Sequence, residues 1–349
     1  MLYLTEPEAL GALLPDQPEY RARQLREWLY QSPVLGTEAM TNLPKSLRNS
    51  MANQLWPFTV TLEQTADAGT TRKWLFKGEG GASIESVLMG YPRRNTLCIS
   101  SQAGCAMGCT FCATGQFGFE RHLEAGEIVA QIAFARASLR ANPMPGCPDR
   151  LTNVVFMGMG EPLANYRRVR ESLRRMIEVM GMSARNITVS TVGVAPGIRR
   201  LADEPWPVGL AISLHAARDE ERSVLVPLND RYPIADLIDA ARYFFEAKGR
   251  RVSIEWTLIA GKNDHDEQAM DLVAIARRMR AHVNVIALNP TPLSTDVPPD
   301  RHQIERFLTV LQRQGITATL RDTRGSDIDA ACGQLRIRAA RSARPDDSQ

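Results

Sequence analysis

The feature that most constrains the fold is a regular alternation of short apolar runs and longer helical patterns from Asn95 onward. The apolar runs are rich in β-branched residues and lie at 96–100, 153–157, 187–190, 209–213, 252–258 and 283–288. Helical patterns separate most of them, at 127–139, 166–180, 234–248 and 267–279. Strands separated by helices need crossover connections, which are right-handed and produce a parallel sheet. The sequence therefore predicts an α/β fold, either a doubly wound sheet or a partial barrel of six strand–helix units.

The regions on either side of this core have a different character. The first sixty residues contain two short helical patterns, at 18–30 and 45–55, which are expected to dock on the main domain and either pack there or contact RNA. Two strand-like runs around a Gly-rich turn then predict a hairpin. The expected regions are a helical accessory domain at 1–60, a β-hairpin extension at 61–90, the core at 91–330 and a C-terminal segment at 331–349.

Composition restricts the compartment and the partners. The chain of 349 residues is 44% hydrophobic and 23% charged, and its net charge of +3 permits a nucleic-acid partner without requiring one. Residues 1–6 lack the basic start and apolar run of a signal peptide. No uncharged apolar stretch approaches the ~20 residues of a membrane span. We therefore expect a cytoplasmic protein with reduced thiols and no membrane association.

Three of the six cysteines fall within eight residues, at Cys105, Cys109 and Cys112. This spacing lets one loop direct three thiolates at a soft metal centre, and the loop follows the first core strand, at the end of the sheet where α/β folds bind ligands. Three thiolates would leave one iron of a four-iron cluster open to a substrate or cofactor. A structural zinc site is the alternative, with His122 or Cys147 as the fourth ligand.

The three cysteines, with Phe111 before the last, resemble the radical S-adenosylmethionine (SAM) superfamily. Longer motifs extend the resemblance along nearly the whole chain: MTNLPKSLR, SSQAGCAMGCTFCATGQFGF, VVFMGMGEPLANY, LAISLHAARDEERSVLVPLN, ALNPTP and RGSDIDAACGQL. Together they resemble the RlmN/Cfr family, methyltransferases that act on adenine carbons of RNA. The resemblance implies a partial (β/α)6 TIM-like radical SAM barrel with a small N-terminal helical domain, and a 4Fe-4S cluster on Cys105, Cys109 and Cys112.

Polar residues recur where the expected strands end. The Gly158-to-Pro162 turn ends the second strand, where Glu161 offers a carboxylate to an amino group. Each such residue alone is typical of an ordinary loop, but their recurrence favours a shared ligand. The resemblance implies that they hold SAM, and the implied set is Gly160, Glu161, Ser190, Ser213, Leu214, His215 and Asn289.

Two further cysteines lie outside the cluster motif. Strand alternation places Thr96, Cys98 and Ser100 on one face, and Cys332 lies in a small-residue segment. Either cysteine alone is typical of a small core residue. The resemblance implies that Cys98 and Cys332 form the essential pair of the family and that Glu85 is its proton acceptor, while Cys147 matches nothing in the family.

The resemblance also implies a mechanism that uses two SAM molecules per turnover. The first SAM methylates Cys332, and the second is cleaved reductively to a 5′-deoxyadenosyl radical that takes a hydrogen from the methylated Cys332. The resulting carbon radical adds to the adenine ring. Cys98 then attacks the Cys332 sulfur, which forms a transient disulfide bond and releases the methylated base.

The resemblance implies methylation of C2 of an adenosine in 23S rRNA, and also in tRNA. The alternatives are methylation of adenine C8 and a non-catalytic, metal-stabilised RNA-binding protein. We expect a monomer that receives electrons from an external donor such as flavodoxin or ferredoxin. Basic clusters that could hold phosphates, or be solvated helix faces, lie at Arg93-Arg94, Arg167-Arg168 with Arg170, and Arg199-Arg200.

Overall fold

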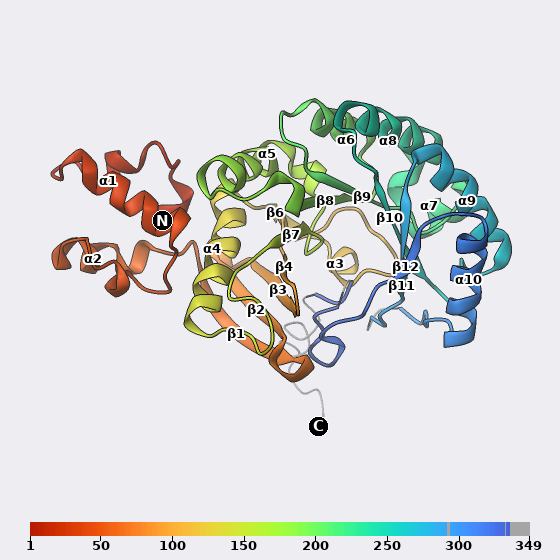
Figure 1. Ribbon diagram of the computed structural model, residues 1–349, viewed down its shortest axis with the longest axis horizontal. Helices are drawn as coiled ribbons and strands as arrows, with labels where there is room; N and C mark the ends of the chain where they lie inside the picture. Colours follow the sequence, from red (N-terminus) through yellow and green to blue (C-terminus); the bar gives the residue numbers. More distant parts are fainter. Residues whose placement is uncertain (292–293, 332, 336–349) are drawn as a thin grey trace, which may run out of the picture. The chain divides into compact units, whose positions relative to one another are not determined.

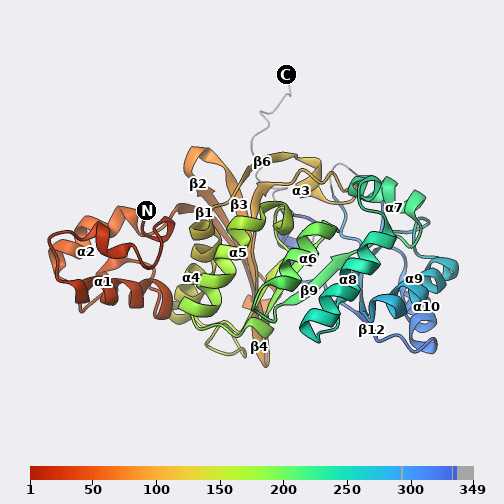
Figure 2. The same cartoon turned by 90° about the horizontal axis from the view of Figure 1, so that it is seen from above.

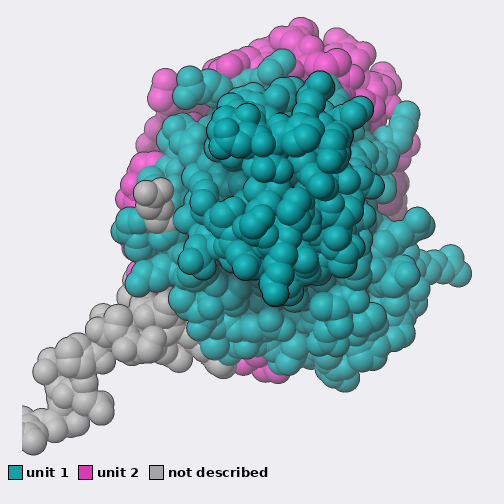
Figure 3. Space-filling view, turned by 90° about the vertical axis from the view of Figure 1, so that its left-hand side faces the viewer, with its two compact units in different colours: residues 1–103, 121–158, 165–187 teal, residues 104–120, 159–164, 188–349 magenta. Residues whose placement is uncertain are grey.

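The computed structural model describes residues 1–291, 294–331 and 333–335. The described chain divides into two compact units, coloured separately in Figure 3. Unit 1 contains residues 1–103, 121–158 and 165–187. Unit 2 contains the described residues of 104–120, 159–164 and 188–349. Two short segments, 104–120 and 159–164, therefore belong to unit 2 although unit 1 residues flank them in sequence.

Unit 1 begins with the two predicted helices, α1 (Glu19–Arg26) and α2 (Lys45–Met51), which lie near the N-terminus in Figure 1. Both are shorter than the sequence patterns, because a π-helical turn (Glu27–Gln31) continues α1 and a 3-10 turn (Ala52–Gln54) continues α2. Within unit 1, ring contacts join this region to α4 (Ala125–Ala141). Trp56 stacks on Tyr3 with ring centroids 5.1 Å apart and meets Phe134 edge-on at 5.3 Å.

The sheet of unit 1 is mostly antiparallel. Its strands, in spatial order, are β1 (Phe58–Ala66), β2 (Thr71–Gly78), β3 (Ser83–Tyr91), β4 (Arg94–Cys98) and β7 (Asn153–Phe156). The predicted hairpin is β2–β3, and β4 pairs in parallel with β7. Helices α4 (Ala125–Ala141) and α5 (Tyr166–Arg174) pack against each other (Figure 2). A capping box between Glu124 and Glu127 begins α4.

Unit 2 contains consecutive parallel strands. They are β8 (Ile187–Thr191), β9 (Gly209–Ser213), β10 (Ser253–Leu258), β11 (His282–Ala287) and β12 (Ala318–Leu320), in that spatial order. The connecting helices are α6 (Ala195–Asp203), α7 (Asp219–Leu225), α8 (Ile234–Lys248), α9 (Asp266–Met279) and α10 (Arg301–Arg313). Helices α6, α8, α9 and α10 pack one after another (Figure 2). The predicted α/β class is confirmed.

The cysteine loop is bracketed by two short strands, β5 (Gln102–Gly104) and β6 (Phe119–His122), which pair with each other. Helix α3 (Ala113–Gln116) begins directly after Cys112. Parallel strands bring their carboxyl ends to one edge of a sheet, so the loops that follow β8, β9 and β11 share an edge in unit 2. In the described part of the chain, no helix is long and apolar enough to cross a membrane.

Candidate functional site

The three-cysteine loop folds back on itself. At its base, the Cys105 N–H donates to the Gly118 carbonyl at 2.9 Å. Within it, the Cys112 N–H donates to the Cys109 carbonyl at 3.2 Å, and the Cys112 carbonyl accepts the Gln116 N–H of α3 at 3.0 Å. The backbone of each cysteine is therefore tied to a fixed partner, which orients the three thiols.

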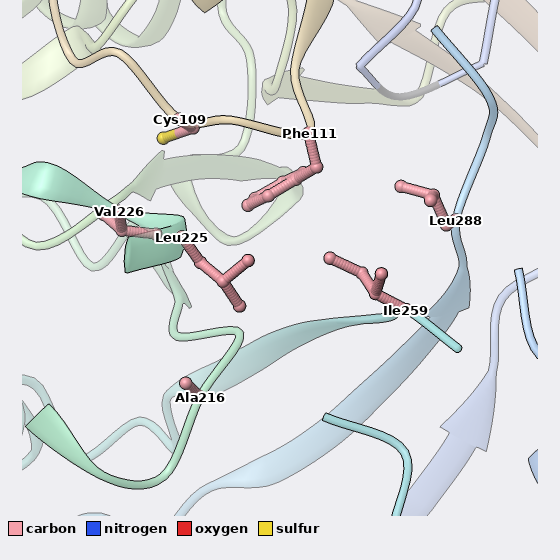
Figure 4. Close-up of a cluster of buried hydrophobic side chains, with 7 residues drawn as sticks. All are labelled: Cys109, Phe111, Ala216, Leu225, Val226, Ile259 and Leu288. Atoms are coloured by element: carbon pink, nitrogen blue, oxygen red, sulfur yellow. The ribbon is translucent and has the colours of Figure 1, made fainter. Parts of the chain in front are cut away.

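An apolar cluster surrounds the middle of this loop. Cys109 and Phe111 are buried against side chains from the end of α7 and from the loops that follow β9, β10 and β11, and Figure 4 shows Phe111 between Leu225 and Leu288. The other buried members are Ala216, Val226 and Ile259. The Thr110 N–H donates to the Leu225 carbonyl at 3.2 Å, which ties the loop to the end of α7. This packing limits the access of water to the Cys109 thiol.

Burial makes the free thiolates costly. It raises the pKa of Cys105 to about 12 and holds the pKa of Cys109 well above its usual range, and the other thiols add to both rises. A bound metal cluster would supply the positive charge that such buried thiolates need. Among the residues described, no three His, Cys, Asp or Glu side chains converge as ligands of a single ion. The donor set fits a cluster, in which each cysteine binds a different iron.

The turn after β7 presents Glu161. Gly160 has φ +95°, a conformation that favours glycine and that lets the chain turn sharply there. One Glu161 oxygen accepts the Leu163 N–H at 2.9 Å and the other accepts the Val192 N–H at 2.8 Å. Burial outweighs these hydrogen bonds and raises the pKa of Glu161 to about 7. This carboxyl is held by two hydrogen bonds, is almost inaccessible to solvent and can bind a cationic group.

His215, two residues after the end of β9, has a left-handed conformation with φ +62°, which is strained for a residue other than glycine. Its Nδ1 accepts the Thr257 N–H at 3.0 Å, and its carbonyl accepts from Asn263 Nδ2 at 2.7 Å. Burial, followed by the charge of Arg222, lowers the pKa of His215 to about 3. The neutral ring then carries its proton on Nε2, and Phe111 contacts it edge-on at 4.7 Å.

The remaining predicted SAM-binding residues follow neighbouring strands of the same unit. Ser190 is the second-last residue of β8, Ser213 ends β9, Leu214 follows it, and Asn289 comes two residues after β11. Leu214 is fully buried, and Ser213 and Asn289 are half-buried. Unit 2 therefore contains the entire predicted cluster-binding and SAM-binding set.

Cys98 and Glu85 lie in unit 1, on the same face of its sheet. In the strand register, Lys73, Val87 and Cys98 form one cross-strand row on β2, β3 and β4, and Glu85 lies two residues from Val87. The Glu85 carboxylate is buried, and its Oε2 lies 3.4 Å from Lys73 Nζ. The general expectation for an isolated strand glutamate, exposure, is wrong here.

Sequence reasoning missed two buried cations. They are Lys73, beside Glu85 in unit 1, and Arg222, on α7 in unit 2. The hairpin register around the Gly-rich turn could have placed Lys73 diagonally across from Glu85. Arg222 gave no such signal, because it lies in the charged run DEER, which is typical of a solvated helix face.

Cys332 lies outside the described residues, but Gly333, its neighbour in sequence, does not. The Gly333 carbonyl accepts the Ala113 N–H at 2.7 Å, directly after Cys112. No disulfide bond joins any two of the five cysteines that the structure describes, so the expected disulfide bond is not supported. Cys147 donates to the Pro145 carbonyl at 3.3 Å and covers Gly90 of β3.

Two family models match this chain. The radical SAM superfamily model matches residues 99–273, and the model of the ribosomal RNA large subunit methyltransferase N-terminal domain matches residues 14–56. Radical SAM domains use a 4Fe-4S cluster and SAM, so the family supports a cluster in place of the zinc alternative.

Curated relatives match over most of their length. A probable dual-specificity RNA methyltransferase RlmN from Mycolicibacterium paratuberculosis is 50% identical over 331 residues, which cover 91% of this chain and 89% of the relative. The protein of the same description from Bifidobacterium adolescentis is 48% identical over 345 residues, covering 95% and 89%. The crystal structure of a radical SAM methyltransferase from Sphaerobacter thermophilus is 48% identical and matches with a TM-score of 0.90, covering 96% of this chain and 99% of that one. The chain therefore belongs to the RlmN family of radical SAM RNA methyltransferases.

Proposed function

We propose that this enzyme methylates C2 of an adenosine in 23S rRNA and in tRNA, through a methyl group carried on Cys332. The observation that carries the proposal is the hydrogen bond from the Ala113 N–H to the Gly333 carbonyl. A methyl carrier must reach SAM at the cluster, and this bond joins the sequence neighbours of Cys332 and Cys112. The description of the curated relatives as dual-specificity RNA methyltransferases supports two classes of RNA substrate.

The roles of the residues in unit 2 follow from their chemistry. Cys105, Cys109 and Cys112 hold the cluster, and Glu161 receives the amino group of SAM. Gly160 lets the backbone approach the ligand, and the other strand-end residues (Ser190, Ser213, Leu214, His215 and Asn289) hold its ribose, carboxylate or adenine. The cluster supplies an electron to SAM, which supplies both the methyl group and a hydrogen-abstracting radical. The surrounding apolar side chains keep water from these groups.

The two cysteines outside the cluster act on the carried methyl group. Cys332 accepts the methyl on its sulfur and presents the carbon to adenine. Glu85 takes the proton that leaves the methylated ring carbon, and its buried carboxylate lies 3.4 Å from Lys73 Nζ. Cys98 attacks the Cys332 sulfur, and the transient disulfide that forms releases the base.

The other parts of the chain serve the RNA and the electron supply. We propose that residues 1–60 contact RNA, which their similarity to a ribosomal RNA methyltransferase N-terminal domain supports. The hairpin region 61–90 carries Glu85, the core at 91–330 carries the cofactors, and 331–349 carries Cys332. The enzyme works as a cytoplasmic monomer, where thiols stay reduced and a flavodoxin or ferredoxin can donate electrons.

The experiment is methylation of 23S rRNA and tRNA from a strain without this modification, followed by nucleoside mass spectrometry. We expect 2-methyladenosine from both RNAs, formed only with SAM and a reductant. The 8-methyl isomer would assign the enzyme to the alternative reaction. Cluster-loaded protein that cleaves SAM but methylates neither RNA would overturn the substrate proposal.

The roles of the cysteine pair are tested by trapping. Cys98→Ala should still methylate Cys332 and add the carbon to RNA, but without a thiol to attack the Cys332 sulfur it should remain covalently joined to the RNA. Denaturing electrophoresis with labelled RNA detects the adduct. Cys332→Ala should load the cluster and transfer no methyl group. Cys147→Ala is the control, because this free thiol covers Gly90, and it should turn over normally without an adduct.

A further inference from the structure

Arg222 of α7 is a fully buried cation that binds neutral oxygens. Its Nε donates to the Leu214 carbonyl at 3.0 Å, and its Nη1 donates to Asn229 Oδ1 at 2.9 Å. Its Nη2 donates to the carbonyl of Val192 and, at 3.4 Å, to that of Ser213. Four donated bonds hold the guanidinium in place, and within the described part of the chain no carboxylate forms an ion pair with it.

A buried charge usually has a charged partner, because an unbalanced ion is costly in a dry interior. Burial lowers the pKa of Arg222 to about 10, so the side chain still carries its positive charge at neutral pH. Neutral oxygens satisfy its hydrogen bonds, and the negative charge of Asp219 on the same helix opposes the fall in its pKa without offsetting the effect of burial. Because burying this charge costs free energy, we infer that it has a role in the site.

Helix α7 brings this charge to the cysteine loop. The Leu225 carbonyl at the end of α7 accepts the Thr110 N–H, and Leu225 belongs to the apolar cluster that buries Cys109. The cation therefore lies where it can stabilise negative charge on the cluster.

The same guanidinium fixes two loops that carry predicted SAM-binding residues. The Val192 N–H donates to Glu161 at 2.8 Å, and the Val192 carbonyl accepts from Arg222. Leu214, which also accepts from Arg222, directly precedes the strained His215. One side chain thus connects the carboxyl on the turn after β7 to the residues that end β9.

We propose that Arg222 is a positioning residue that holds the SAM-binding ends of β8 and β9 together, and that its charge makes the cluster easier to reduce. The second role follows because reduction adds a negative charge to the cluster, which a nearby fixed cation stabilises. The proposal rests on the proposed function, in which Cys109 binds the cluster and the strand ends bind SAM.

Two substitutions separate the charge of Arg222 from its geometry. Arg222→Gln removes the charge but keeps an amide donor, and Arg222→Lys keeps the charge but loses the planar fork. All measurements use the anaerobically reconstituted enzyme. Iron and sulfide content shows whether the cluster is loaded, EPR-monitored titration gives its midpoint potential, and calorimetry gives the Kd for SAM. Arg222→Gln should have a more negative midpoint potential. Both variants should bind SAM about 10-fold to 100-fold more weakly, the range for residues that orient ligands of a metal site.

Arg175→Gln is the matched control. Arg175 is a buried arginine of unit 1 that donates to the Tyr3 and Thr5 carbonyls and to Glu171. Its loss should change neither the midpoint potential nor the Kd for SAM.

The two Arg222 variants test the charge role and the positioning role separately. An unchanged midpoint potential in Arg222→Gln overturns the charge role, and a wild-type Kd in Arg222→Lys overturns the positioning role. If Arg222→Gln does not load a cluster, Arg222→Lys still decides, because it must keep the wild-type potential while binding SAM more weakly. Wild-type protein that loads no cluster would instead refute the proposed function.

Discussion

Two buried glutamates, one in each unit, have their charge balanced in different ways. Glu85 of unit 1 is 1% exposed and lies 3.4 Å from the ammonium of Lys73, which is equally buried. Glu161 of unit 2 is 2% exposed and accepts backbone N–H groups from Leu163 and Val192. These bonds do not offset burial, which raises the pKa of Glu161 to about 7.

The difference separates a charge that the fold balances from a charge kept for a ligand. In unit 1 the chain supplies its own cation, because Lys73 Nζ lies 3.4 Å from the Glu85 carboxylate. In unit 2 the carboxyl lies near its titration point, and an incoming amino group would complete the pair. This contrast supports the proposed roles of Glu85 as a base and of Glu161 as a SAM-binding group.

The largest expected effect comes from breaking the pair in unit 1. Lys73→Met leaves the Glu85 carboxylate buried without its cation and should lower the free energy of unfolding by about 3–5 kcal/mol. Urea denaturation followed by the fluorescence of the five tryptophans measures it. The double variant Lys73→Met/Glu85→Leu should recover most of the loss, because it removes the uncompensated charge. A single variant as stable as the wild type would show that the pair does not balance a buried charge.

A smaller effect is expected from neutralising Glu161. Glu161→Gln keeps the shape of the side chain but removes the charge that the amino group of SAM would meet, and it should weaken SAM binding by about 2–3 kcal/mol. Calorimetry at pH 8 measures the Kd, and unfolding should change little, because the wild-type carboxyl is already half-protonated near pH 7. Glu171→Gln in unit 1 is the control and should bind SAM normally.

The pKa of Glu161 also predicts how SAM binding depends on pH. Since that pKa is about 7 in the SAM-free protein, binding below pH 7 must first remove a proton. Affinity should therefore fall as the pH falls, approaching about tenfold per pH unit well below 7, and should level off above it. Glu161→Gln should lack this dependence and keep only the titration of SAM itself. The same slope in wild type and variant would contradict the assignment.

The smallest effect should come from an exposed pair. Arg301 Nε lies 2.7 Å from Glu305 Oε1, and the arginine side chain is 92% exposed. Water screens such a pair, so Arg301→Ala should change the free energy of unfolding by less than about 0.5 kcal/mol. A loss comparable to that of Lys73→Met would show that burial does not explain the contrast between the pairs.

Local sequence signals predicted the regular elements well and the short ones poorly. Helix α8 has the predicted bounds, because its apolar periodicity is long and Gly249, with φ +63°, ends it. Strand β1 was missed because most of its residues are exposed and its pattern includes Thr, Glu and Gln. Helices α6 and α7 were missed because each is short, and α7 reads as a charged surface run.

The candidate site shows the same limit. The three cysteines were proposed from their spacing, and Glu161 was proposed from the resemblance of its local motif to the radical SAM superfamily. The burial of Glu85 beside Lys73 depends on pairing between strands. The proposed role of Arg222 depends on contacts between α7 and the ends of β8 and β9, which no local sequence pattern predicts.

The assignment of residues 104–120 to unit 2 has a consequence for the order of events during synthesis. The cysteine loop leaves the ribosome long before Leu225, Ile259, Leu288 and Gly333, which later cover or bond it. At ordinary translation rates this delay lasts roughly tens of seconds. During that interval the nascent chain exposes its thiols to solvent, so we expect the delivery of iron and sulfide to be easiest before translation ends.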